Sequence, residues 1–282
     1  MVADVDPLAP LVDLPGVEEA LARARQACET LRWHEAYRRR WREVRAEAGV
    51  RSARASAAID GARVPLDSLR AIATGAGGEP GASFVVASGA LRAAAAVEAL
   101  MPDLGARSAP ALPPFGQLLA RVHTAAASGL VDPGELGRLR TSAAPLDLIG
   151  LGPAPAGDEL AARLALLRSV VEVTRAPALV LGAVVHGELL ALRPFVAGNG
   201  VVARAVTRLV LTQRGLDPTG SVVGESAWAD APARYVAAAA GFAAGTDDGI
   251  ARWIASCADA VVAGATAATQ VADAVLGGSL GA

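Results

Sequence analysis

The sequence contains no lysine and a single asparagine, although it is 282 residues long and carries 26 basic residues. All of the basic residues are therefore arginine. Lysine and asparagine are both encoded by AT-rich codons, so their scarcity is typical of a protein from a GC-rich bacterial genome. Against this bias, the one asparagine, Asn199, is worth inspecting as a functional residue.

Cysteine and aromatic residues are also scarce. The two cysteines, Cys28 and Cys257, form no disulfide framework, which fits a protein of the reducing cytoplasm. Aromatic residues make up 4% of the chain, whereas alanine, the strongest helix former, accounts for 67 of the 282 residues. This composition argues against a large β architecture and favours an all-α fold.

Long hydrophobic runs and a strong net charge are absent as well. No window of about 18 or more apolar residues lacks a charge, and the nearest approach, 176–192, contains His186 and Glu188, so we expect no membrane span. The acidic, proline-interrupted start of the chain does not resemble a signal peptide. The formal net charge of −2 exerts no general attraction for nucleic acid or membrane.

Hydrophobic periodicity predicts a mainly helical chain. The predicted helices are 17–48, 52–60, 65–73, 84–100, 113–128, 158–174, 177–192, 200–214, 231–243 and 248–276. Residues 131–157 are irregular, and the extended-looking run of Leu146, Leu148 and Ile149 leaves room for one small β-hairpin.

One loop, between the helices predicted at 177–192 and 200–214, carries residues suited to chemistry. Gly198, Asn199 and Gly200 tolerate left-handed backbone angles, so their N–H groups can converge on an anion at the start of the second helix. Arg204 and Arg208 follow on one face of that helix. The arrangement suits a phosphate group, and an ordinary loop between two packed helices is the alternative.

The loop also resembles the active-site motif of the Fic family. Residues 193–204 read RPFVAGNGVVAR, and the family pattern is HPFx(D/E)GNGRxxR, which matches without a gap. The six matching positions are Pro194, Phe195, Gly198, Asn199, Gly200 and Arg204. The resemblance implies a Fic-like helical bundle, with a small β-hairpin as its flap and with Pro194 and Phe195 as the anchor of the loop.

The flanking segments extend this resemblance over about 51–265. Residues 51–69 resemble the family's inhibitory-helix pattern (S/T)xxxE(G/N), with Ser56, Asp60 and Gly61 at the matching positions. We therefore divide the chain into an N-terminal arm and helix (1–50), an inhibitory-helix-like segment with a linker (51–83) and a Fic-like helical domain (84–278).

Three departures from the motif bear on the activity that the resemblance implies, which is the transfer of AMP from ATP to a protein hydroxyl. Arg193 replaces the histidine that acts as general base, and a guanidinium has no acceptor for a proton. Ala197 replaces the acidic residue that holds Mg²⁺, a metal that needs hard oxygen ligands. Val201 replaces the first motif arginine. AMP transfer by the family's mechanism is therefore not expected, and no Mg²⁺ site is expected at the loop.

Asp60 stands where the family has an inhibitory glutamate, which pairs with the second motif arginine. In this sequence that arginine is Arg204, so we expect an Asp60–Arg204 ion pair with a structural role. The alternative is that Asp60 is a helix-end residue beside Gly61.

The histidines and the basic segment have plainer interpretations. His186 lies about two helical turns before the loop, so we interpret it as a packing residue or as one that supports the site from outside. His34 and His123 have no ligand spacing around them, and we expect no zinc site. The arginines of 38–54 alternate with glutamates, which favours a solvated helix face over a phosphate-binding one.

Together these features predict a catalytically degenerate Fic-fold protein, a pseudoenzyme that acts as a binding or regulatory module in the cytoplasm. Its expected partners are an unidentified protein and, at Gly198–Gly200 with Arg204, ATP or another anion. Two alternatives stay open. One is an active transferase with altered catalytic residues, in which Arg193 stabilises developing charge. The other is a nucleic-acid binder that uses the 38–54 arginines.

Overall fold

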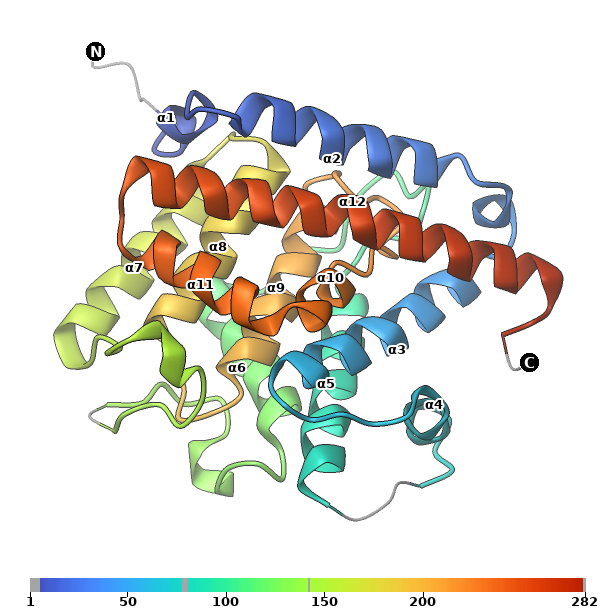
Figure 1. Ribbon diagram of the computed structural model, residues 1–282. Helices are drawn as coiled ribbons and strands as arrows, with labels where there is room; N and C mark the ends of the chain where they lie inside the picture. The colour runs from blue at the N-terminus through green and yellow to red at the C-terminus, as the bar shows by residue number, and fades with distance from the viewer. Residues whose placement is uncertain (1–5, 78–80, 142, 281–282) are drawn as a thin grey trace.

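The computed structural model describes residues 6–77, 81–141 and 143–280, and helices make up most of it (Figure 1). The α-helices are α1 (Ala9–Val12), α2 (Val17–Arg32), α3 (Trp41–Ile59), α4 (Leu66–Ala73), α5 (Ala82–Glu98), α6 (Phe115–Ala127), α7 (Gly157–Val173), α8 (Ala178–Leu192), α9 (Asn199–Gln213), α10 (Glu225–Asp230), α11 (Pro232–Ala243) and α12 (Asp247–Gly277). Short 3₁₀ helices span Glu35–Arg38, Pro133–Glu135 and Ile149–Leu151. The predicted all-α class is confirmed.

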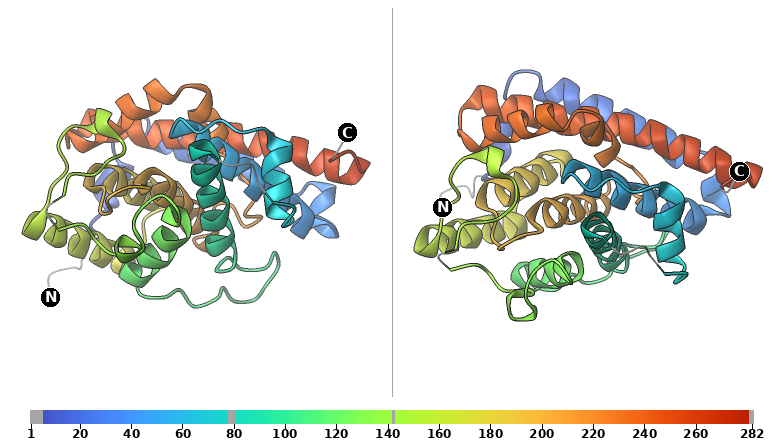
Figure 2. Two further views of the ribbon diagram at one scale, coloured as in Figure 1. Left: turned by 90° about the horizontal axis from the view of Figure 1, so that it is seen from below. Right: turned by 60° about the horizontal axis from the view of Figure 1, so that its bottom comes forward.

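Helices α8 and α9 lie at the centre of the molecule, packed side by side. Thirteen residues of α8 are buried, and only Ala178 and Glu188 of this helix are not. Figure 2 shows α2 and α12 together on one side of this pair and α6 on the opposite side. The loop at 193–198 therefore joins two core helices, so its backbone is held from several directions.

Two of the predicted helices have different bounds in the structure. The helix predicted at 17–48 ends at Arg32, because the extended backbone of His34 starts a 3₁₀ turn and its ring accepts a hydrogen bond from Ala36 N–H at 3.3 Å. Helix α3 then runs without interruption through the segment predicted as a separate piece at 52–60, and across the boundary placed after residue 50.

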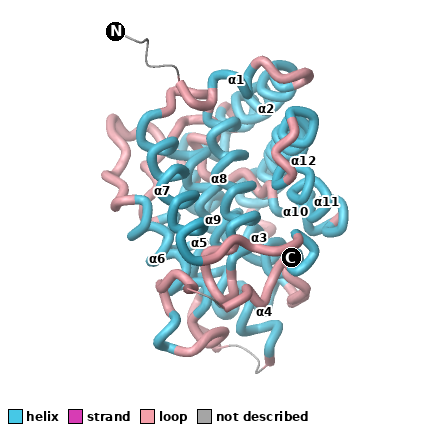
Figure 3. Tube along the Cα trace, turned by 90° about the vertical axis from the view of Figure 1, so that its left-hand side faces the viewer, coloured by secondary structure: helices cyan, strands magenta, loops and turns pink. Residues whose placement is uncertain are grey.

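The small hairpin expected within 131–157 is not formed among the described residues, which contain no strand (Figure 3). The extended parts of the segment bond to the central loop and form no ladder with each other. Arg140 N–H donates to Pro194 O at 2.9 Å, and Leu146 N–H donates to Val196 O at 2.7 Å. Leu148 then takes a left-handed backbone conformation, with φ of 55°, which ends the extended run.

Helix α12 is long and apolar enough to cross a membrane, judged by length and composition alone. In the structure it packs along α2 and against α11, and its residues Trp253 and Ile254 are fully buried in the core.

Helices α5 and α6 pack closely, since a Cβ at Gly89 would lie 2.0 Å from Ala126 O. Only glycine permits that approach.

Candidate functional site

The central loop is anchored by Phe195, as the sequence predicts. Its side chain is fully buried, and its ring stacks on the ring of His123 on α6, with centroids 3.8 Å apart and an interplanar angle of 4°. Gly198 follows with φ of +80°, a left-handed conformation that costs glycine little, and caps α9. Gly198 therefore turns the chain into α9, and Asn199 and Gly200 already belong to that helix.

His123 connects the same loop to the 131–157 segment through its two ring nitrogens. Nδ1 accepts a hydrogen bond from Gly137 N–H at 2.9 Å, so Nε2 carries the proton and donates to Ala197 O at 3.1 Å. Burial lowers the pKa of this histidine. The sequence assigned His123 a structural role, and the structure specifies that role as support of the loop.

Asn199 is bonded within the loop and beyond it. Its Oδ1 accepts from Phe195 N–H at 2.9 Å, and its Nδ2 donates to Phe195 O at 2.9 Å. The same Nδ2 donates to Oδ1 of Asp147 at 2.7 Å, and the backbone N–H of Asn199 donates to Oδ2 of Asp147, also at 2.7 Å. The Asp147 carboxylate thus lies at the N-terminus of α9, the place where the sequence predicts a bound anion.

The sequence analysis missed Asp147. It belongs to the irregular segment 131–157, and no periodicity or motif marks it. The only available signal was its charge, since a carboxylate is stabilised at a helix N-terminus by unpaired N–H groups and by the helix dipole.

Arg193, at the position of the family's base, is almost fully buried and bonded to the backbone. It ends α8 with φ of 42°, and its Nη1 and Nη2 donate to the carbonyls of Leu148 at 3.0 Å and Gly152 at 2.7 Å. Arg140, another residue that the sequence analysis missed, donates from Nε to Arg193 O at 2.7 Å and from Nη2 to Leu192 O at 2.9 Å. Two arginines thus tie the 140–152 segment to the end of α8.

Ala197 and Val201, at the metal and phosphate positions of the motif, are both buried apolar residues. Neither side chain can coordinate a cation or pair with a phosphate. Among the described residues, no group of three or more His, Cys, Asp or Glu side chains is arranged to hold a metal ion.

The expected Asp60–Arg204 ion pair is present, with Nη2 of Arg204 at 2.7 Å from Oδ2 of Asp60. Arg204 also donates to Ser56, from Nε to Oγ at 2.8 Å and from Nη2 to the backbone O at 3.0 Å. Its side chain is fully buried, whereas that of Asp60 keeps 17% of its accessible surface. Gly61, with φ of +87°, lets the chain turn away directly after Asp60.

The charge on this arginine is maintained despite its burial. Burial by itself would lower the pKa of the Arg204 guanidinium, but the neighbouring Asp60 carboxylate and Tyr235 hydroxyl raise it above its ordinary value. The pair therefore fixes the C-terminal end of α3 on α9 through a charged, hydrogen-bonded contact.

His186 is a packing residue, in keeping with the sequence interpretation. Its ring is fully buried against Trp228 and Trp253, and its Nε2 lies 2.8 Å from the hydroxyl of Tyr235. Burial and the nearby positive charge of Arg204 hold its pKa well below the usual value.

The two buried histidines lead to a prediction on pH. In the unfolded chain both take up protons near pH 6.5, whereas in the folded protein burial lowers the pKa of each, so that protons bind only at lower pH. The free energy of unfolding should therefore fall below pH 6.5, by up to about 1.4 kcal/mol per pH unit for each histidine. Urea unfolding at pH 7 and pH 5 measures this, and His186→Gln should reduce the slope. An unchanged slope in that variant would contradict the assignment.

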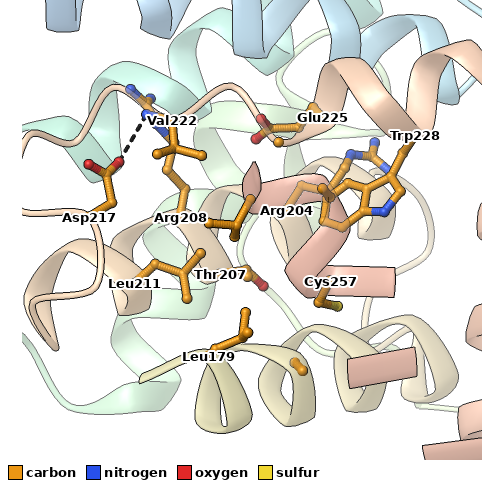
Figure 4. Close-up of a pocket in the computed structure, with 14 residues that line it drawn as sticks. Leu179, Arg204, Thr207, Arg208, Leu211, Asp217, Val222, Glu225, Trp228 and Cys257 are labelled. Carbon is orange, nitrogen blue, oxygen red and sulfur yellow. Dashed lines mark hydrogen bonds between the residues drawn. The ribbon is translucent and has the colours of Figure 1, made fainter. Parts of the chain in front are cut away.

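A cavity of about 30 Å³ lies beside Arg204, between α8, α9, α10 and α12 (Figure 4). Arg208, Glu225 and Trp228 line it together with apolar residues. Arg208 is buried there and donates from Nη2 to Gly220 O at 2.6 Å, so it does not serve the loop. A space of this size suits water and not a nucleotide.

The arginines of 38–54 do not form one free basic face. Arg40 pairs with Glu43, and Arg42 pairs with Asp103. Arg45 is buried and donates to Thr219 O at 2.7 Å. These arginines are therefore paired with groups of the same chain, which argues against the nucleic-acid alternative.

The fold and the site define a helical protein in which a glycine-containing loop joins two core helices, and a carboxylate of the chain itself bonds to the N-terminus of the second helix. No protein-family model and no curated protein matches the sequence. Solved structures do match. A Fic family protein from Desulfovibrio desulfuricans G20 is 21% identical with a TM-score of 0.72, over 91% of this chain and 74% of its own.

Two further structures give the same result. Fic-1 from C. elegans is 20% identical with a TM-score of 0.67, over 93% of this chain and 74% of its own. A Fic domain containing signaling protein from Bacteroides thetaiotaomicron VPI-5482 is 12% identical with a TM-score of 0.65, over 90% of this chain and 98% of its own. The chain therefore has the Fic fold.

Proposed function

We propose that this protein is a Fic-fold pseudoenzyme that transfers no AMP and acts as a binding or regulatory module. The observation that carries the proposal is the Asp147 carboxylate, which accepts both the backbone N–H and the side-chain amide of Asn199. The anion-binding turn is thus used by the chain itself, as a clasp that holds the 140–152 segment against α8 and α9.

The base position supports this proposal. Both terminal nitrogens of Arg193 are engaged by backbone carbonyls, and a guanidinium cannot accept the proton of an attacking hydroxyl. The loss of a general base alone typically costs roughly 10²- to 10⁴-fold in rate. An alternative transferase would use Arg193 to stabilise charge, but those carbonyl contacts direct its guanidinium away from that task.

The electrostatics at the start of α9 support it as well. Besides Asp147, the Asp60 carboxylate lies close to the loop, since a Cβ at Gly200 would be 2.8 Å from its Oδ1. Two carboxylates at one helix N-terminus repel the phosphates of ATP, and no acidic side chain at position 197 offers Mg²⁺ as a bridge. ATP is therefore expected to bind weakly, with or without Mg²⁺.

Calorimetry with ATP tests the role of Asp147. We expect no measurable ATP binding by the unaltered protein, no gain on adding Mg²⁺, and at least tenfold tighter binding by Asp147→Gly, a gain of about 1.4 kcal/mol. Asp132→Gly changes the charge equally at an exposed position and serves as the control. Equal ATP binding by the unaltered protein and Asp147→Gly would contradict the proposal that Asp147 keeps phosphate from the N-terminus of α9. AMP transfer by the unaltered protein would overturn the whole proposal.

A further inference from the structure

We infer that a groove between α2 and the ends of α7, α8 and α9 is a binding site for a small, multiply charged anion of the phosphate class. Its volume is about 490 Å³, within the range of small-molecule sites. Helix α9 separates it from the central loop by roughly 20 Å, since a helix rises about 1.5 Å per residue. The inference is therefore independent of the function proposed for the loop.

The lining of the groove is strongly basic, although the chain as a whole carries a net charge of −2. Its charged members are four arginines and one glutamate, namely Arg25, Arg32, Arg175, Arg214 and Glu29. The basic residues come from three separate parts of the chain and converge only in the fold. This concentration of one charge gives the groove a local positive potential.

Three of these arginines have charges that the fold leaves uncompensated. Among the described residues, no carboxylate lies within ion-pair distance of Arg25, Arg32 or Arg175, whereas eight other arginines of the chain do form such pairs. Guanidinium groups match the oxygens of a phosphate in a bidentate fork, so several around one concave space favour a ligand with more than one phosphate.

One side of the groove is fixed by hydrogen bonds. Arg214 is held by its contacts to the C-terminal end of α7, from Nη1 to Thr174 O at 3.1 Å and from Nη2 to Val171 O at 2.8 Å. The Asp6 carboxylate fixes the next turn by accepting from the Thr174 hydroxyl at 2.7 Å. This side of the groove therefore loses little conformational entropy when a ligand binds.

The remaining lining suits the rest of such a ligand. Leu21, Cys28 and Leu179 form an apolar floor, so an uncharged part of the ligand can be buried there. Ala178 and Leu179 belong to the first turn of α8, whose dipole adds to the attraction for negative charge.

Titration of the full-length protein with pyrophosphate, at low ionic strength, tests the inference. We expect saturable binding, weakened at least tenfold in the Arg32→Ala, Arg175→Ala double variant. The matched control is Arg121→Ala, Arg138→Ala, which removes the same charge at exposed positions elsewhere and should bind as the unaltered protein does. Asp132→Gly should also leave pyrophosphate binding unchanged, because Asp132 is exposed and lies outside the lining of the groove.

Several outcomes would overturn the site. These are the absence of pyrophosphate binding, an equal loss in the control variant, or binding that the substitutions of the groove arginines leave unchanged. Citrate, which carries carboxylates and no phosphate, separates the ligand classes. Citrate binding as tight as that of pyrophosphate would contradict a preference for phosphate. All four substituted arginines are exposed, so we expect each variant to fold. Thermal unfolding of each variant checks this expectation.

Discussion

Replacement of Arg204 by methionine should lower the free energy of unfolding by about 3–5 kcal/mol, because it leaves polar groups buried without their partner. The fully buried guanidinium bonds Ser56 through its hydroxyl and its carbonyl, and it pairs with Asp60. Methionine fills much of the volume but donates no hydrogen bond. Urea unfolding of the two proteins at pH 7 gives the difference directly.

The partner of the ion pair provides the control. Asp60→Asn keeps an oxygen acceptor for Arg204 and lies at the partly exposed end of the pair, so its effect should be only about 1 kcal/mol. The double variant should be less destabilised than the sum of the two single variants, since the residues are in contact. Stability unchanged by Arg204→Met would show that the buried cluster does not hold α3 on α9.

Restoration of AMP transfer is the second large effect that we expect. The set Arg193→His, Ala197→Asp and Val201→Arg rebuilds the base, the metal ligand and the phosphate clamp of the family motif. Asp60→Gly releases Arg204, and Asp147→Gly clears the start of α9. With all five changes, automodification from labelled ATP should rise at least 100-fold above the unaltered protein, the smallest gain typical of a general base alone, about 10²-fold.

The partial variants sharpen this test. Single reversions should have almost no effect, because catalytic groups that act as a unit are strongly non-additive. The variant with four changes that retains Asp147 should transfer no AMP, since the Asp147 carboxylate still occupies the N-terminus of α9. Activity in that variant would contradict the role assigned to Asp147. If the variant with all five changes is folded but transfers no AMP, ATP is excluded as a ligand of this loop.

Much of the fold was predictable because its helices are marked by local signals. Apolar periodicity and flanking prolines placed α8 and α9 within one or two residues of their observed bounds. The break at Trp33–Arg40 was missed, since Arg-rich and Glu-rich segments read as helix whether or not the chain turns. The turn depends on the His34 ring and on packing against α12, which periodicity does not report.

The same distinction applies to the site. The spacing of Gly198, Asn199, Gly200 and Arg204 was enough to predict the loop, and Phe195 was correctly expected to be its anchor. The ion pair of Asp60 with Arg204 was reached only through a resemblance, because the two residues are 144 positions apart. Arg140 and His123 act on the loop from the segment 121–140, and the sequence did not indicate that these two residues contact the loop.

The sequence by itself determined the helical class and the position of the loop, and residue type alone excludes a proton acceptor on the side chain of Arg193 and a metal ligand on that of Ala197. Only the tertiary structure decided which residues contact the loop. Asp147 reaches Asn199 across 52 positions, and Arg193 reaches the Leu148 carbonyl across 45. Contacts of this range depend on how the irregular segment packs on two core helices, and packing of that kind leaves no periodic trace in the sequence.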